Sequence, residues 1–92
     1  MRPIQEISAD VGTAIDKYDL DALQKLKSEL DELGTKEAHA LARRVDGTMC
    51  HYTGHLPQAI EHFEEAQSSF EVLDDRLGAA MVANQIGNVY YE

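Results

Sequence analysis

The chain of 92 residues has little cysteine, few basic residues and no long hydrophobic run. Its single cysteine, Cys50, excludes a disulfide within the chain and favours a reducing, cytoplasmic setting. No segment has the length and apolarity of a signal peptide or a membrane-spanning helix, so we expect a cytoplasmic protein without a membrane partner. Eight basic residues against seventeen acidic ones give a formal net charge of −9, which repels phosphate backbones and disfavours nucleic-acid binding.

Motifs of catalytic and metal-binding sites are also missing. The sequence contains no nucleophile elbow, no phosphate-binding glycine loop and no calcium loop. The one cluster with metal-ligand side chains consists of Cys50, His51, His55 and His62. His51 and His55 are four residues apart, but Gly54 and the expected turn fall between them, and the spacing from His55 to His62 matches no common zinc site. Cys50 is expected to be a small core residue. The acidic pairs at 64–65 and 74–75 diverge on a helix or lie at its cap, which disfavours acid–base catalysis. We therefore expect no enzyme activity, no metal and no cofactor.

Apolar residues recur every three or four positions in the first third of the chain, which predicts two amphipathic helices within residues 3–33. The first stripe consists of Ile4, Ile7, Val11, Ala14 or Ile15, and Tyr18. The second stripe consists of Leu20, Leu23, Leu26, Leu30 and Leu33. Asp19 is placed to cap the second helix, and Gly34 is placed to end it.

Residues 36–52 and 56–73 are predicted to form the third and fourth helices. Thr35 can cap the third helix through its hydroxyl group. Gly54 separates the two helices because glycine adopts the left-handed turn conformation at low cost. Pro57 suits a first helical turn, where its missing N–H costs little.

Small residues and one aromatic residue predict that these two helices form a close hairpin. Ala59, Phe63 and Ala66 recur at four and three residues, so they share one helix face. Gly47 and Ala59 allow two antiparallel helices to approach closely, with Phe63 filling the space beside them. The spacing of these residues together with Gly54 resembles the tetratricopeptide repeat, or TPR. The resemblance implies an all-α fold of antiparallel helical hairpins, stacked as a right-handed solenoid of about five helices.

A recurrence at forty residues supports the same resemblance. Ala40 and Gly47 return as Ala80 and Gly87, an interval longer than the usual TPR period of about 34 residues. The chain is therefore similar to the long-helix variety of TPR, with repeats of about 40 residues, which occurs in bacterial signalling and regulatory proteins. On this resemblance residues 1–92 form a single TPR-like domain, with a degenerate repeat at 3–33, a clear repeat at 36–73 and the first helix of a further, incomplete repeat at 75–92.

The third predicted helix departs from the TPR pattern. In the register set by Gly47, positions that are usually large and apolar hold Arg43, Asp46 and Cys50. The stronger apolar stripe consists of Leu41, Val45, Met49 and Tyr52. On the resemblance, that stripe would face the concave groove of the array. Either the helix is rotated, or the groove is apolar because something fills it.

The resemblance also implies a ligand site, because the first helices of TPRs present contacts from the concave side. Carried over to this chain, the partner-binding residues are Leu41, Arg44, Val45, Thr48 and Tyr52 from one repeat and Met81, Asn84, Gln85 and Asn88 from the next. Some TPR proteins hold a peptide carboxylate with lysine and asparagine, and here only Arg44 and the stretch 84–88 match. Asparagine and glutamine also suit the backbone amides of an extended peptide. The alternative is a solvated groove wall above ordinary packing.

The last predicted helix is capped by Asp74 or Asp75 and is apolar on all sides from Ala79 through Tyr91. Such a helix is expected to be buried on more than one side. The residues expected to mediate self-association are Met81, Val82, Ile86, Val89, Tyr90 and Tyr91. We expect that the chain is a fragment of a longer array, or that a second copy covers this helix.

The sequence thus favours a non-enzymatic protein–protein interaction module, part of a bacterial signalling or regulatory protein. It would act as a homodimer through the last helix, by binding a peptide in the concave groove, or in both ways. Exchange of the last helix between two copies is one route to a closed dimer. The alternative is a scaffold fragment that positions a separate catalytic or DNA-binding domain.

Overall fold

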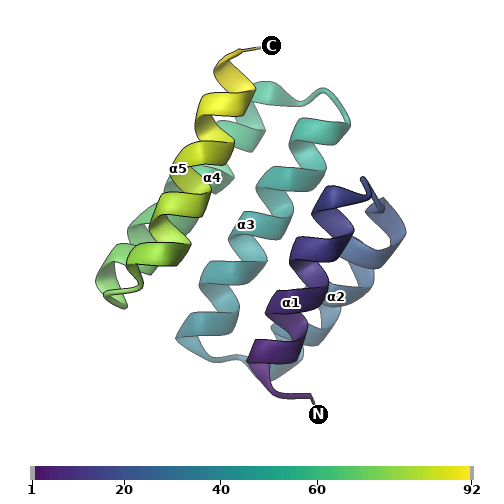
Figure 1. The fold of residues 1–92 in the computed structure, drawn as a ribbon, viewed down its shortest axis with the longest axis vertical. Helices are drawn as coiled ribbons and strands as arrows, with labels where there is room; N and C mark the ends of the chain where they lie inside the picture. The colour runs from purple at the N-terminus through teal and green to yellow at the C-terminus, as the bar shows by residue number, and fades with distance from the viewer. Residues whose placement is uncertain (1, 92) are drawn as a thin grey trace.

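The computed structural model describes residues 2–91, and this part of the chain is all-α, as expected. The five helices are α1 (Ile4–Asp16), α2 (Leu20–Leu33), α3 (Lys36–Tyr52), α4 (Leu56–Val72) and α5 (Arg76–Tyr90). No strand occurs among the described residues. Consecutive helices run antiparallel and are joined by turns of two or three residues (Figure 1). The predicted domain limits 1 and 92 fall on residues outside the described range.

The helix ends confirm the capping residues expected from the sequence. The side chains of Asp19, Thr35 and Asp75 each accept a hydrogen bond from the backbone N–H three residues further on. Gly34 and Gly54 adopt the left-handed conformation, with φ of 65° and 82°. The side-chain caps satisfy backbone N–H groups in the first turn of a helix, which have no partner within the helix. The left-handed glycines allow the chain to reverse after the last turn.

Two turns use a residue that the sequence does not mark as a turn residue. Tyr18 has a φ of 53° and Asp74 a φ of 57°. The left-handed conformation costs an L-residue about 1–2 kcal/mol, less for aspartate than for tyrosine. The prediction that Tyr18 continues the first apolar stripe is wrong, because α1 ends at Asp16 and the ring of Tyr18 is 71% exposed.

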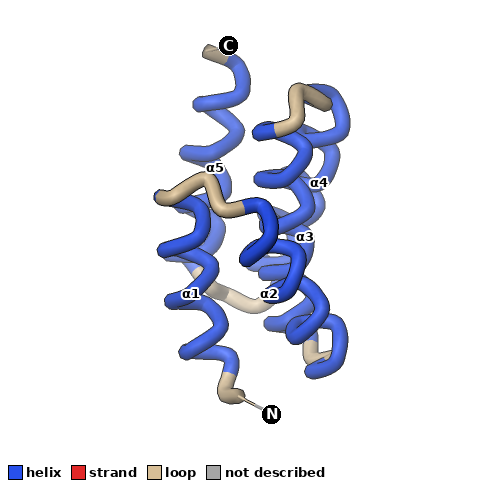
Figure 2. The backbone as a smooth tube through the Cα atoms, turned by 90° about the vertical axis from the view of Figure 1, so that its right-hand side faces the viewer, coloured by secondary structure: helices blue, strands red, loops and turns tan. Residues whose placement is uncertain are grey.

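The five helices are arranged so that α1, α3 and α5 run in the same direction along one side, with α2 and α4 behind them (Figure 1). The side view places α1 and α5 on one side of the molecule and α4 on the other (Figure 2). The start of α1 and the end of α5 lie at opposite ends of the long axis (Figure 1). Because α3 lies between the other helices, its residues are buried around most of its circumference.

The core is formed by the apolar stripes of all five helices. Its members in α1, α2 and α4 are Ile7, Val11, Ala14, Leu23, Leu26, Leu30, Ala59, Phe63, Ala66 and Phe70. Leu33 of the predicted second stripe is only partly buried, and Leu20 is exposed, because they lie at the two ends of α2. The stripe interpretation therefore holds for the helix centres and fails at the helix ends.

Two glycine–phenylalanine contacts bring α4 close to its neighbours. A Cβ atom added to Gly47 on α3 would lie 2.6 Å from two ring atoms of Phe63. A Cβ atom added to Gly78 on α5 would lie 2.6 Å from the ring of Phe70. Close approach at Gly47 was expected from the sequence, with the ring directly over the glycine rather than beside it. The second contact was not expected.

The buried carboxylate of Asp46 on α3 is paired with two basic side chains. Asp46 is buried, and its carboxylate contacts Nζ of Lys27 on α2 at 3.0 Å and Nη2 of Arg43 at 2.6 Å. An ion-pair cluster thus occupies a position that the TPR pattern assigns to an apolar contact. Since paired charges can be buried where single charges cannot, α3 packs on α2 through charge as well as apolar surface.

The forty-residue recurrence extends to the backbone and to burial. Gly34 and Asp74 have the same left-handed conformation, and each is followed by the residue that caps the next helix. Residues 21–30 and 61–70 have the same order of buried, intermediate and exposed positions. The hairpin of α2 and α3 is therefore repeated by that of α4 and α5.

Candidate functional site

The side of the molecule that carries α1, α3 and α5 is hollowed by two cavities. The first, of about 490 Å³, lies near the starts of the three helices. Among its lining residues are Leu41, Arg44 and Met81, all predicted as partner-binding. The second, of about 640 Å³, lies near the ends of the same helices and includes the predicted residues Tyr52, Gln85 and Asn88. We call the surface that contains both cavities the groove.

The other predicted groove residues lie elsewhere. Val45 and Thr48 are fully buried and belong to the core of α3. Asn84 is exposed and lines neither cavity. Val45 therefore serves packing, and Thr48 reaches the groove only through a hydrogen bond.

Sequence reasoning missed the contribution of α1 to the groove. Ile4 and Ser8 line the first cavity, and Ile15 and Tyr18 line the second. The signal was available, since the predicted degenerate repeat at 3–33 would place its first helix beside the first helices of the later predicted repeats. What hid it was the reading of Ile4 and Ile15 as interior residues only.

A hydrogen-bond network joins α3 to α5 across the floor of the groove. Arg44 Nε donates to Gln85 Oε1 at 2.6 Å, and Gln85 Nε2 donates to Thr48 Oγ1 at 2.9 Å. Thr48 Oγ1 in turn donates to the Arg44 carbonyl oxygen at 2.9 Å. Since Arg44 lines one cavity and Gln85 the other, this network separates the two halves of the groove.

Arg44 is an unusual residue for this position because it is a cation with only 8% of its surface exposed. Burial lowers the pKa of its guanidinium, while Tyr52 and Asp16 act in the opposite direction. Its Nε hydrogen bond goes to a neutral amide oxygen, which compensates the charge less than a carboxylate would. An anionic or carbonyl-rich ligand in the first cavity would therefore gain a charged donor.

The second cavity is lined by three of the four tyrosines of the chain. We call this cavity the tyrosine pocket; it is lined by Ile15, Tyr18, His51, Tyr52, Gln85, Asn88 and Tyr91. The rings of Tyr18 and Tyr52 are tilted by 45°, with centroids 4.8 Å apart. Tyr52 donates its hydroxyl hydrogen to the Ile15 carbonyl oxygen at 3.0 Å, which fixes its ring. Burial raises the pKa of the Tyr52 phenol, and Tyr18 and Asp16 act in the same direction.

The residues predicted for self-association on α5 divide into two groups. Val82 and Val89 are buried inside the chain, so they are occupied by intramolecular packing. Ile86 is partly buried, and Met81, Tyr90 and Tyr91 are exposed. The helix is thus covered on the side of α4 and open on the opposite side, where Ala80 and Ala83 are exposed.

The two glycines of the forty-residue recurrence have different surroundings. Gly47 lies under the Phe63 ring, whereas nothing lies within 4 Å of a Cβ atom added to Gly87. The outer side of α5 therefore repeats the small residues of α3 without a helix over them.

The histidine and cysteine cluster has no metal-site geometry. Within residues 2–91, no group of three or more histidine, cysteine or acidic side chains gathers closely enough to hold a metal ion. Cys50 is partly buried against the core, and burial raises the pKa of its thiol, with Asp46 contributing. A raised thiol pKa lowers the fraction of reactive thiolate. In the acidic pair at 74–75, Asp75 is the cap of α5.

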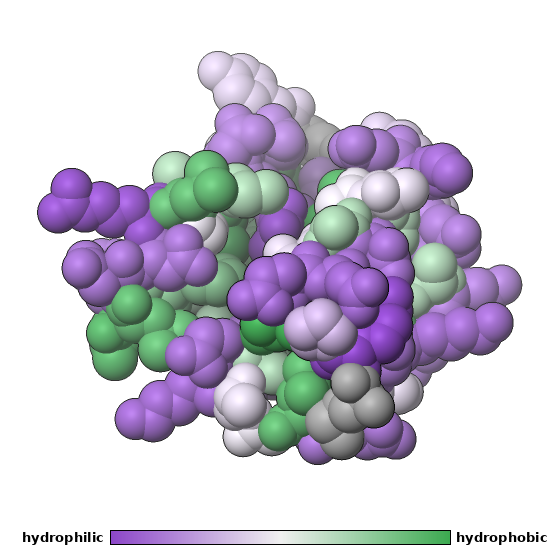
Figure 3. Space-filling view, turned by 60° about the horizontal axis from the view of Figure 1, so that its bottom comes forward, coloured by the Kyte–Doolittle hydropathy of each residue, from purple (hydrophilic) through white to green (hydrophobic). Residues whose placement is uncertain are grey.

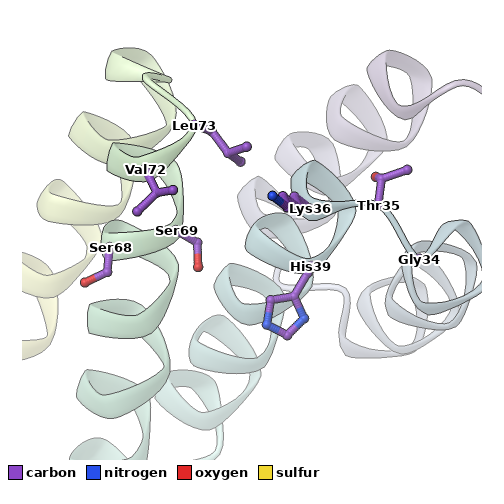
Figure 4. Close-up of a pocket in the computed structure, with 8 residues that line it drawn as sticks. All are labelled: Gly34, Thr35, Lys36, His39, Ser68, Ser69, Val72 and Leu73. Atoms are coloured by element: carbon purple, nitrogen blue, oxygen red, sulfur yellow. The ribbon is translucent and has the colours of Figure 1, made fainter.

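A further cavity, of about 420 Å³, lies outside the groove, between the start of α3 and the end of α4. Figure 4 shows Ser69 of α4 and Leu73, which follows α4, on one side and His39 of α3 on the other, with Ser68 directed away. Its polar side chains do not converge on a common point. The face of the molecule drawn in Figure 3 is mostly hydrophilic, with separate hydrophobic patches. This cavity therefore offers less chemistry than the groove.

None of the helices within residues 2–91 combines the length and the apolarity needed to span a membrane. Comparison of the chain with protein-family models, with curated proteins and with solved structures gives no match.

Proposed function

We propose that this chain is a non-enzymatic protein–protein interaction module, a TPR-like helical array that associates with a second copy through the open side of α5. The observation that carries the proposal is the contrast between Gly47 and Gly87. The first is covered by a phenylalanine of the next helix, and the second repeats its position with open space above it. A helix surface of small residues permits the close backbone approach that helix pairs use.

The distribution of charge supports a second copy as the partner. The chain carries a formal net charge of −9, so two copies repel each other over most of their surface. The stretch from Arg76 to Tyr91 contains no acidic residue at all. In an antiparallel pair of α5 helices, Arg76 of one copy would lie near the tyrosines at the end of the other. Cation–π contact and opposed helix dipoles would both favour that pairing.

The test compares two glycine variants that add the same charge. Gly87→Glu and Gly12→Glu both place glutamate where an added Cβ meets nothing within 4 Å. Each should strengthen its own helix by up to about 1 kcal/mol, since glycine is a poor helix former. Light scattering on a sizing column should then give twice 10.3 kDa for the wild type and for Gly12→Glu. It should give a single copy for Gly87→Glu.

Two results would contradict self-association. One is a monomeric wild type across a concentration series. The other is a Gly87→Glu variant that keeps the wild-type mass. Because Gly87→Glu is expected to stabilise α5, unfolding of the variant would not explain a loss of the dimer.

A second candidate function is peptide binding in the groove, favoured by its two cavities and by the buried Arg44. Leu77 lines the first cavity and Val72 lines the separate cavity at the end of α4, and both side chains are exposed. A panel of synthetic decapeptides, measured by fluorescence polarisation, should include sequences whose saturable binding is lost in Leu77→Glu and kept in Val72→Glu. Equal losses in the two variants would argue against a groove site.

A further inference from the structure

We propose that the tyrosine pocket binds the charged end of a lysine or arginine side chain from a partner peptide. The inference rests on the peptide-binding function of the groove and names the residue class that one end of the groove selects. The pocket is lined by residues near the ends of α1, α3 and α5, which run in the same direction along one side of the molecule (Figure 1).

The aromatic residues of the pocket come from three separate elements. Tyr18 follows α1, Tyr52 ends α3 and Tyr91 follows α5, and the fourth tyrosine of the chain, Tyr90, does not line the pocket. The face of an aromatic ring carries partial negative charge, and organic cations bind where several such faces surround one space. With a volume of about 640 Å³, the pocket has room for the end of a long basic side chain.

Two of the three rings are held in place by contacts near the ends of α1 and α3. Tyr18 remains in the left-handed conformation although its side chain is 71% exposed. Its ring gains the contact with Tyr52, whose hydroxyl group is fixed by the Ile15 carbonyl oxygen. The left-handed conformation itself belongs to the turn, because Gly34, Gly54 and Asp74 adopt it at the other three helix–helix turns. What is particular to the first turn is that this position carries an aromatic ring.

The electrostatic surroundings favour a cation. The whole chain is strongly acidic, and the carboxylate of Asp16 acts on Tyr52 at the wall of the pocket. Asn88, which is exposed at the rim, offers a side-chain carbonyl oxygen as an acceptor. Arg44 lines the other cavity and donates its Nε hydrogen to Gln85. Its positive charge also acts on Tyr52 and opposes the effect of Asp16, but its influence is the smaller of the two.

The experiment uses the full chain and three matched peptides of the form Ac-Gly-Gly-X-Gly-Gly-NH2, in which X is lysine, arginine or norleucine. Norleucine keeps the aliphatic chain of lysine and removes its charge. Tyrosine ring signals are followed by NMR during titration in 150 mM salt. We expect saturable shifts of the Tyr18, Tyr52 and Tyr91 rings with the lysine and arginine peptides and little change with the norleucine peptide. The Tyr90 ring serves as the internal control.

Substitutions separate the aromatic faces from the hydroxyl groups. Tyr18→Leu and Tyr91→Leu should each weaken binding of the lysine peptide about three- to fivefold, the size expected for one exposed cation–π contact. Tyr18→Phe and Tyr91→Phe should retain it. Tyr90→Leu should also retain it, although this side chain is 73% exposed and adjacent to Tyr91. Because these residues are exposed, their replacement should leave the fold intact, and thermal melts of each variant check this.

Three outcomes would overturn the proposal. Equal shifts with the norleucine peptide would show an apolar site, and wild-type affinity in Tyr18→Leu would show that lysine binds surface carboxylates. Tighter binding of tetramethylammonium than of either basic peptide would assign the pocket to a free small cation. If the tyrosine pocket fails these tests, peptide binding in the groove still stands when decapeptides of the panel bind Val72→Glu and do not bind Leu77→Glu. The two proposals can therefore fail separately.

Discussion

α3 and α5 have the same landmarks forty residues apart, yet α3 is enclosed by its neighbours and α5 has an open side. Each begins after a left-handed residue and a side-chain cap, and each repeats the alanine and glycine of the other. The two helices differ in what packs on their glycines, Gly47 and Gly87. Phe63 of α4 lies on Gly47, while no described residue approaches Gly87 in the same way. The same alanine–glycine spacing thus serves as a core contact in one helix and as an open surface in the other.

The largest effect is expected from removing the ring that encloses α3. Phe63 is fully buried, so Phe63→Ala should destabilise the fold by about 3–5 kcal/mol, the usual cost of deleting a buried phenylalanine. Because a domain of this size has little stability in reserve, the variant should be largely unfolded at room temperature. Circular dichroism during urea unfolding measures it. A cooperative transition close to that of the wild type would mean that α3 does not depend on this contact.

The ion-pair cluster of α3 gives the next largest effect. Asp46→Asn leaves Lys27 and Arg43 without their carboxylate partner, which should cost about 2 kcal/mol. The matched control is Asp31→Asn on the exposed side of α2, where a change within about 0.5 kcal/mol is expected. Urea unfolding of both variants tests the difference. Equal effects would show that the charge of Asp46 contributes no more than a surface charge.

The contrast between the two glycines predicts opposite signs for one substitution. Gly47→Ala places a methyl group against the buried Phe63 ring and should destabilise the fold by about 1–2 kcal/mol, since overpacking outweighs the gain in helix propensity. Gly87→Ala meets no obstacle and should stabilise the chain by up to about 1 kcal/mol. Thermal and urea unfolding measure both.

A double substitution sharpens that comparison. If the ring is the cause, Gly47→Ala should cost less in a Phe63→Leu background, because leucine occupies a smaller and more adaptable volume. Additive effects of the two substitutions would locate the strain elsewhere. Destabilisation by Gly87→Ala at low protein concentration, where dimers are not populated, would contradict the open surroundings of α5.

These contrasts also show what the sequence can predict. The range of the third helix, the capping roles of Asp19 and Thr35, and the closeness of Gly47 to the fourth helix were predicted correctly, because each depends on neighbours within one hairpin. The first helix was predicted too long, because it ends at Asp16. The contact of Gly78 with Phe70 was missed, since Gly78 lies at the start of α5 outside the repeated alanine–glycine spacing. Local periodicity thus gives the elements and their faces.

The candidate site was harder to predict because it joins distant segments. The network of Arg44, Gln85 and Thr48 depends on the separation of α3 and α5, which no spacing in the sequence reports. The position of Tyr18 depends on a left-handed turn at a residue that rarely adopts one. Three of the predicted partner-binding residues therefore lie outside the cavities, and the residues of α1 that line them were not among the predicted ones.

The smallest change in stability is expected at the turns that precede α3 and α5. These turns allow a direct test, because the residues at positions 34 and 74 can be exchanged. Gly34 and Asp74 occupy equivalent left-handed positions, but only glycine adopts this conformation without a steric penalty. Asp74→Gly should therefore stabilise the chain by about 0.5–1 kcal/mol, and Gly34→Asp should destabilise it by a similar amount. Urea unfolding of the two single variants and of the double exchange measures this. Because the two positions lie at different turns, the double variant should return close to wild-type stability. A stabilising Gly34→Asp would mean that the aspartate side chain gains an interaction at this turn that outweighs the backbone strain, and the two hairpins would then differ in their turns as well as in their cover.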